Sequence, residues 1–145
     1  MTDWLEKLHY LQNLIHELGI EKSVRFCGYI KREEVFEEMD KNDFFIMPSV
    51  NETFGLVYLE AMARGLIVVG MKNWGIDGII SDEENGFLCE DDKQESITQK
   101  IDQVFSLTIV ERQKIINNSL KTVKEYTDKK AADSYLNWIS ALVQK

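Results

Sequence analysis

Two glutamates and the glycine between them are the residues of this sequence with the clearest chemical potential. Glu52 and Glu60 stand eight positions apart, and Gly55 lies where a helix is predicted to begin after a strand that ends at Pro48. A glycine there lets a ligand approach the backbone closely, because it carries no Cβ. The N–H groups of Gly55, Leu56 and Val57 would face outward at the positive end of the helix dipole. They form a predicted anion site that needs no basic side chain.

The two carboxylates are poor ligands for a phosphate, because like charges repel. They are well suited to accept hydrogen bonds from hydroxyl groups on either side of a bound anion. An anion held by backbone between two hydroxyl-bearing groups describes a sugar–pyrophosphate–ribose molecule. Alternatively, Glu52 only complements the helix dipole and Glu60 is a solvated helix residue. The residues alone leave both interpretations open.

Strands and helices are predicted to alternate along the chain and to position this segment. The predicted strands cover residues 23–28, 43–49, 66–70 and 86–89. The predicted helices cover residues 4–18, 31–41, 55–64, 93–105, 110–126 and 128–143. The apolar runs in 43–49 and 66–70 are typical of strands buried on both faces. We therefore predict an α/β fold, a Rossmann-like parallel sheet with helices on both faces, in a single domain spanning residues 1–145.

The composition limits the classes of function. The chain has 145 residues and a formal net charge of −8, which argues against binding to nucleic acid or to anionic lipid. No segment approaches the roughly 18 apolar residues of a membrane span, and no signal peptide is recognisable, so a cytoplasmic protein is expected. His9 and His16 have no further ligand in register, and two cysteines are too few for a disulfide framework, so neither a metal site nor a disulfide scaffold is predicted.

The segment NETFGLVYLEAMARGLIVVG, residues 51–70, closely resembles the C-terminal, donor-binding domain of the retaining GT-B glycosyltransferases of group 1, family 4. That family combines Pro-Ser, a glutamate, Phe-Gly-Leu, a second glutamate eight positions after the first, and a Val-Val strand. Residues 24–29 and 85–88 resemble the flanking strands of the family. The resemblance covers nearly the whole chain in order and supports the predicted fold, in which the first strands of the domain are lacking.

The resemblance implies a role for each matching residue. Glu52 would be the catalytic residue, contacting the hydroxyls of the donor sugar and facing the reacting carbon, and Glu60 would hold the ribose hydroxyls. The residues expected to bind the donor or its nucleotide are Gly28, Tyr29, Ile30, Phe54, Gly55, Leu56, Val57 and Glu60. The implied reaction is metal-independent hexosyl transfer with retention from a UDP- or GDP-sugar, without a cofactor, in bacterial surface polysaccharide biosynthesis.

Two departures from the family accompany the resemblance. The loop after the Val-Val strand contains Trp74 in place of the usual glycine pair; this side chain could support a sugar ring, although packing is the favoured interpretation. The N-terminal acceptor domain and a basic Arg/Lys pair are expected to be missing. The chain is therefore predicted to be part of a larger enzyme, inactive by itself, which in full length associates with the inner face of the membrane. Alternatives are a non-catalytic nucleotide-sugar-binding module, a subunit of a split enzyme, or an interaction domain that uses its acidic surface and an open strand edge for a partner. An exposed strand edge would also allow a homodimer.

Overall fold

The computed structural model describes residues 3–53 and 55–127 of the chain. By its internal contacts the chain divides into two compact units, Met1–Val35 and Phe36–Lys145, each of which is described by itself. The helix predicted for residues 128–143 lies outside the described residues. Whether both units belong to one domain stays a prediction.

The first unit contains helix α1, Asp3–Glu17, where a helix was predicted. Gly19 follows with a φ of 65°, which suits the left-handed end of a helix. The predicted strand over residues 23–28 is wrong, since none of these residues forms a strand. A strand requires a hydrogen-bonded neighbour, and the described part of this unit holds a helix but no strand that could pair with it.

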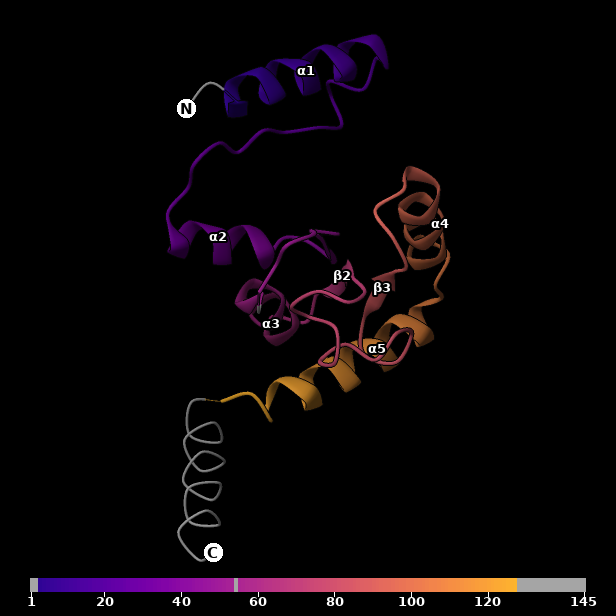
Figure 1. Ribbon diagram of the computed structural model, residues 1–145. Helices are drawn as coiled ribbons and strands as arrows, with labels where there is room; N and C mark the ends of the chain where they lie inside the picture. The colour runs from indigo at the N-terminus through magenta and orange to yellow at the C-terminus, as the bar shows by residue number, and fades with distance from the viewer. Residues whose placement is uncertain (1–2, 54, 128–145) are drawn as a thin grey trace, which may run out of the picture. The chain divides into compact units, whose positions relative to one another are not determined.

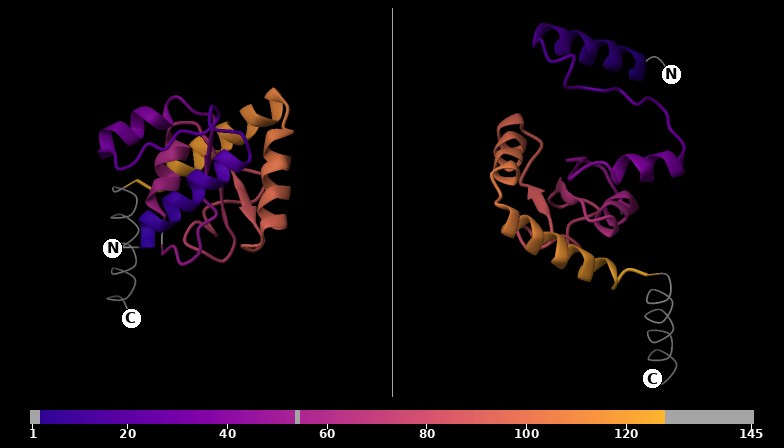
Figure 2. Two further views of the ribbon diagram at one scale, coloured as in Figure 1. Left: turned by 90° about the horizontal axis from the view of Figure 1, so that it is seen from above. Right: turned by 180° about the vertical axis from the view of Figure 1, so that it is seen from behind.

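The second unit is built on a parallel sheet of three strands, which confirms the predicted fold class (Figure 1, Figure 2). Strand β1, Phe44–Ile46, pairs with β2, Ile67–Met71, and β2 pairs with β3, Phe87–Cys89. The order in the sheet is β1-β2-β3, so β2 is the central strand. All five residues of β2 are buried, as its unbroken apolar sequence predicts.

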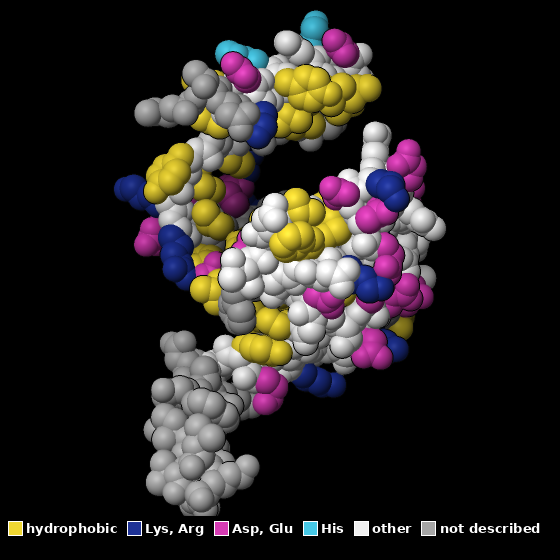
Figure 3. Space-filling model, in the orientation of Figure 1, with side chains coloured by type: hydrophobic (Ala, Val, Ile, Leu, Met, Phe, Trp, Pro, Cys, Tyr) yellow, Lys and Arg dark blue, Asp and Glu magenta, His cyan; other side chains and the backbone are white. Residues whose placement is uncertain are grey.

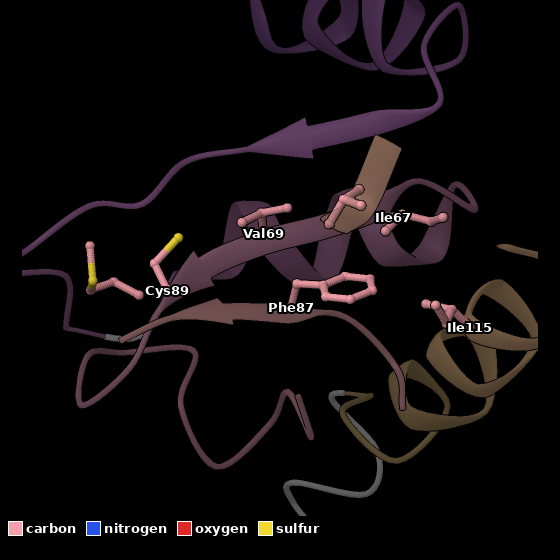
Figure 4. Close-up of a cluster of buried hydrophobic side chains, with 7 residues drawn as sticks. Ile67, Val69, Phe87, Cys89 and Ile115 are labelled. Carbon is pink, nitrogen blue, oxygen red and sulfur yellow. The ribbon is translucent and has the colours of Figure 1, made fainter. Parts of the chain in front are cut away.

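Helices cover both faces of the sheet. The helices that pack on it are α3, Leu56–Ala63, α4, Gln94–Phe105, and α5, Ile109–Val123. A further helix, α2, Arg32–Met39, crosses the boundary between the two units in the sequence. One face packs against α4 and α5 through a cluster that includes Val69, Phe87 and Ile115 (Figure 4). The opposite face approaches α3, because a Cβ on Gly70 would lie 3.3 Å from the ring of Tyr58.

Strand β1 differs from the prediction of a strand buried on both faces. Phe44 and Phe45 are half-buried and Ile46 is exposed. The physical reason is its position, since β1 is an outer strand of the sheet among the described residues and has β2 on one side only. Four consecutive apolar residues therefore indicated a strand correctly but did not reveal which place in the sheet it occupies.

A long loop, residues 72–86, joins β2 to β3 without a helix. The buried amide of Asn85 holds this loop to α5. Its Nδ2 donates to the carbonyl of Ile79 at 3.0 Å and to Oγ1 of Thr122 at 2.8 Å, and its Oδ1 accepts from the N–H of Ser81 at 2.7 Å. The amide thus uses both its donor and its acceptor capacity, which fixes the returning part of the loop.

None of the helices in the described ranges has the length and apolar character needed to cross a bilayer. Acidic and basic side chains are interspersed on the α4 side of the face in Figure 3, where the described residues form no broad basic patch.

Candidate functional site

The loop between β1 and α3 leads directly into a helix start that has no side-chain cap. Gly55 is the N-cap residue and adopts a left-handed conformation with φ 68° and ψ 50°. The carbonyl of Gly55 accepts the N–H of Tyr58 at 2.9 Å, but a glycine offers no side-chain acceptor, so no side-chain cap serves the N–H groups of Leu56 and Val57. Leu56 is exposed and Val57 is half-buried at this end. Binding of an anion at the start of this helix stays a prediction.

The chain itself requires a glycine at position 55. A Cβ built there would lie 2.6 Å from Cδ2 of Tyr58 and 3.4 Å from Cγ of Glu52. The left-handed φ adds a second reason, since other residues adopt it only at a cost. Gly55 is thus needed for the turn and for the close approach of Tyr58, in addition to any approach of a ligand.

Tyr58 is a residue of the site that sequence reasoning missed. Its side chain is almost fully buried, with 1% exposed, and its hydroxyl donates a hydrogen bond to the carbonyl oxygen of Met47. Its ring meets that of Phe45 edge to face, with centroids 5.6 Å apart. Burial raises the pKa of this phenol. The sequence signal for this role is an aromatic residue with a polar group inside an otherwise aliphatic helix.

Glu52 lies in the loop before α3 and is half-buried. Its carboxylate Oε1 accepts the N–H of Thr53 at 3.1 Å. Its carbonyl oxygen accepts the N–H of Gly75 at 2.9 Å, which ties the loop after β1 to the loop after β2. Two loops at the carboxyl ends of neighbouring parallel strands thus meet at Glu52, which is where ligands bind in open sheets of this type.

Glu60 lies on α3 and is half-buried. It lines a cavity of about 550 Å³ together with Phe36, Asp40, Ala63 and Arg64. Arg64 forms an ion pair with Asp40, and its guanidinium lies 4.5 Å from the ring centroid of Phe36. The positive charge beside Glu60 is therefore engaged by Asp40, and the cavity presents the apolar, aromatic and carboxylate groups that suit a nucleoside.

The other predicted donor-binding residues lie outside the described part of the second unit. Gly28, Tyr29 and Ile30 belong to the Met1–Val35 unit, where Gly28 has a φ of 63° and Tyr29 is 98% exposed. Phe54 lies outside the described residues. A contact of Gly28, Tyr29 and Ile30 with a nucleobase stays a prediction.

A second cavity, of about 430 Å³, lies at the carboxyl ends of β2 and β3. It is lined by residues that include Asn51, Lys72, Asn73, Trp74, Glu90 and Asp91. Nζ of Lys72 contacts the two carboxylate oxygens of Glu90 at 2.8 and 2.9 Å, and these hydrogen bonds raise the pKa of the lysine. Among the described residues, no group of three or more histidine, cysteine, aspartate or glutamate side chains is arranged to hold a metal ion.

The sequence matches the family described as "Glycosyl transferases group 1" over residues 5–122. It is 36% identical over 116 residues to an uncharacterized glycosyltransferase of Methanocaldococcus jannaschii, covering 80% of this chain and 30% of that protein. It is 34% identical over 102 residues to a D-inositol 3-phosphate glycosyltransferase of Corynebacterium urealyticum, covering 70% of this chain and 24% of the relative. The chain thus spans about a quarter to a third of the length of these relatives.

Solved structures show the same fold. The C-terminal domain of a group 1 family glycosyl transferase (LpcC) from Francisella tularensis has a TM-score of 0.79 and 30% identity, covering 88% of this chain and 66% of the other. Anabaena HepE, in complex with UDP and glucose, has a TM-score of 0.80 and 22% identity, covering 97% of this chain and 38% of the other. At that identity HepE supports the fold alone.

Proposed function

The chain belongs to the group 1 glycosyl transferases, with the fold of the C-terminal domain of GT-B enzymes, and from this premise we propose that it is the donor-binding half of such an enzyme. In this proposal it binds a nucleotide-diphosphate sugar, and the whole enzyme transfers a hexose to an acceptor with retention of configuration. The names of its relatives favour a transferase over a non-catalytic binding module.

The uncapped start of α3 carries the proposal. Gly55, in a left-handed conformation, opens a helix in which the N–H groups of Leu56 and Val57 receive no side-chain cap. The diphosphate of the donor would accept hydrogen bonds from these groups at the positive end of the helix dipole. The same groups would stabilise the negative charge that develops on the diphosphate as it leaves, without a metal ion or cofactor.

The two glutamates would hold the hydroxyl groups on either side of the diphosphate. Glu60 lines the cavity beside Phe36 and would accept hydrogen bonds from the ribose. Glu52, tied by its carbonyl to Gly75, would contact the hydroxyls of the donor sugar and face its reacting carbon. Gly28, Tyr29 and Ile30 would border the base.

We infer that the isolated chain does not catalyse transfer. The relatives are three to four times longer than their matched parts, and the acceptor would be bound by a portion that this chain does not match.

The whole enzyme would work in the bacterial cytoplasm at the inner face of the membrane, in the assembly of surface polysaccharide. Incubation of the purified chain with UDP-glucose and an oligosaccharide mixture should release no UDP above the buffer control. Steady release that depends on the oligosaccharide would contradict this inference.

Calorimetric titration of the 145-residue chain tests the binding proposal. We expect saturable binding of UDP or GDP, independent of added EDTA, and tighter binding of the matching nucleotide sugar than of the free diphosphate. Adenosine monophosphate serves as the control, because it lacks the diphosphate that the start of α3 would hold. Absence of heat with either diphosphate at millimolar concentration would refute the proposal and favour an interaction domain. Gel filtration in the same buffer tests for a homodimer formed through an exposed strand edge.

A further inference from the structure

Trp74 is an exposed aromatic residue at a position where packing was the favoured interpretation. Its side chain is 36% exposed and lines the cavity of about 430 Å³ at the carboxyl ends of β2 and β3. A tryptophan placed only for packing is expected to be buried more fully, because burying its large ring is what stabilises the fold. An accessible indole at the wall of a polar cavity is instead typical of a binding surface.

The loop around Trp74 is held in a fixed conformation. Asn73 adopts a left-handed φ of 64°, and its N–H donates to Oδ2 of Asp77 at 2.6 Å. The N–H of Asp77 in turn donates to the carbonyl oxygen of Trp74 at 2.6 Å. The backbone of Trp74 is therefore held before any ligand arrives, so that ordering this backbone adds little to the entropic cost of binding.

This loop adjoins the catalytic residue of the proposed function. The N–H of Gly75, next to Trp74, donates to the carbonyl oxygen of Glu52 at 2.9 Å. Asn51, the neighbour of Glu52, lines the same cavity as Trp74 and has a left-handed φ of 65°. Asn51 thus lines the cavity and is bonded in the chain to Glu52, so the cavity adjoins the candidate site.

The polar groups of the cavity suit hydroxyl groups. Asn51 and Asn73 offer amide donors and acceptors, and Asp91 and Asp92 offer carboxylates. Hydrogen bonds from Lys93 lower the pKa of Asp91, so this side chain is an ionised acceptor at neutral pH. A sugar ring has hydroxyls around its edge and C–H groups on its faces, and it matches an aromatic surface bordered by amides and carboxylates.

We propose that Trp74 and this cavity form a sugar subsite, in which a pyranose ring stacks on the indole and its hydroxyls bond to Asn51 and Asp91. The inference rests on the proposed function, because it specifies which part of the same site takes the sugar. The pyranose ring is part of the donor or of the acceptor. Either sugar would present the same hydroxyl groups and C–H faces to the subsite. Trp74 is then a specificity-determining residue of the transferase.

Calorimetry of the whole chain with UDP and with UDP-glucose tests the subsite. If the subsite takes the donor sugar, Trp74→Ala should lower the affinity for UDP-glucose relative to UDP by about 2- to 12-fold, the range measured for aromatic pairs, whereas an acceptor subsite leaves this ratio unchanged. Trp74→Phe should retain most of the preference, because it keeps an aromatic face. Tyr126→Ala, which removes another exposed aromatic side chain of the same unit, should leave the ratio unchanged. Circular dichroism verifies that each variant is folded.

A second arm uses methyl α-D-glucopyranoside and saturation-transfer NMR. Saturation-transfer signals from its ring protons that disappear in Trp74→Ala support the subsite. If UDP-glucose abolishes these signals in the wild type, the subsite takes the sugar of the donor. If the signals persist in the presence of UDP-glucose, the subsite takes the sugar of the acceptor. An unchanged UDP-glucose preference together with no Trp74-dependent saturation transfer overturns the subsite, even where UDP binds normally. Failure of UDP to bind refutes the proposed function, and the free-sugar signals then decide the subsite by themselves.

Discussion

The hydroxyl of Tyr58 donates a hydrogen bond to the carbonyl oxygen of Met47, and this contact joins the first turns of α3 to the end of β1. Met47 also donates its N–H to the carbonyl oxygen of Val69 in β2, at 3.0 Å. One residue therefore connects the helix, the outer strand and the central strand. The loop that carries Glu52 begins at this junction and ends at Gly55, so its two ends are fixed by buried contacts.

Tyr58→Phe tests this junction. The substitution keeps the buried ring and removes one of two donors to the Met47 carbonyl, which also accepts the N–H of Ser49 at 2.7 Å. We therefore expect the free energy of unfolding to fall by about 0.5–1.5 kcal/mol. Urea denaturation followed by circular dichroism measures the change. Tyr126→Phe is the matched control, since Tyr126 is 43% exposed and should change stability little. Equal stability of Tyr58→Phe and the wild type would show that the hydrogen bond contributes nothing to the fold.

Gly55→Ala should lower the free energy of unfolding by more than the cost of placing an alanine in the left-handed conformation. The left-handed φ costs an alanine about 1–2 kcal/mol, and the new Cβ would also meet the ring of Tyr58 at 2.6 Å. Gly78→Ala separates the two effects, because Gly78 also has a positive φ, of 90°, and no atom within 4 Å of the added Cβ. Urea titration of both variants gives the difference. A smaller loss for Gly55→Ala than for Gly78→Ala would contradict the crowding argument.

Glu60→Ala and Glu52→Ala should separate binding of nucleotide from binding of sugar. Loss of the ribose contact in Glu60→Ala should weaken the binding of free UDP or GDP by about 1–3 kcal/mol. Glu52→Ala should leave the free diphosphate nearly unchanged and weaken only the nucleotide sugar. Calorimetry with both ligands measures the two effects, and an equal loss of diphosphate affinity in both variants would contradict the assigned roles.

The start of α5 should carry a pH-dependent contribution to stability. Oγ1 of Thr108 accepts the N–H of Glu111 at 3.3 Å, and Oε2 of Glu111 accepts the N–H of Thr108 at 2.8 Å. The Thr108 hydroxyl also donates to Oε2 of Glu111 at 2.6 Å, and this side-chain bond, together with that from the Thr108 N–H, lowers the pKa of Glu111 below its ordinary value of 4.5. Because the folded state binds this proton more weakly than the unfolded state, the contribution is present above 4.5 and is lost as the pH falls through and below that value.

Thr108→Ala and Glu111→Gln measure this contribution. At pH 7 we expect Thr108→Ala to lower the free energy of unfolding by about 1 kcal/mol. The difference between Glu111→Gln and the wild type should shrink when the denaturation is repeated at about pH 3. Gln113→Glu, a change of charge on the same helix outside the cap, serves as the control. A difference between Glu111→Gln and the wild type that grows on acidification would contradict the assigned cause.

The sequence predicted well the elements whose evidence is local. The apolar runs of β2 and β3 and the periodic pattern of α3, α4 and α5 specify strands and helices without knowledge of their neighbours. Residues 23–28 alternate as strands commonly do and yet form no strand, because a strand also depends on a partner that a local pattern does not reveal. The half-burial of β1 has the same origin, since its place at the outside of the sheet depends on pairing.

The sequence by itself determined the family, the α/β class and the candidate pair Glu52 and Glu60, because these depend on residue types at fixed spacings along one segment. Only the tertiary structure decided that Gly75 bonds to Glu52, that Tyr58 closes on Met47 and that Trp74 opens into a cavity with Asn51. These contacts join loops after different strands. Their geometry follows from the parallel pairing of β1 with β2 and of β2 with β3, which brings the carboxyl ends of the strands to one edge.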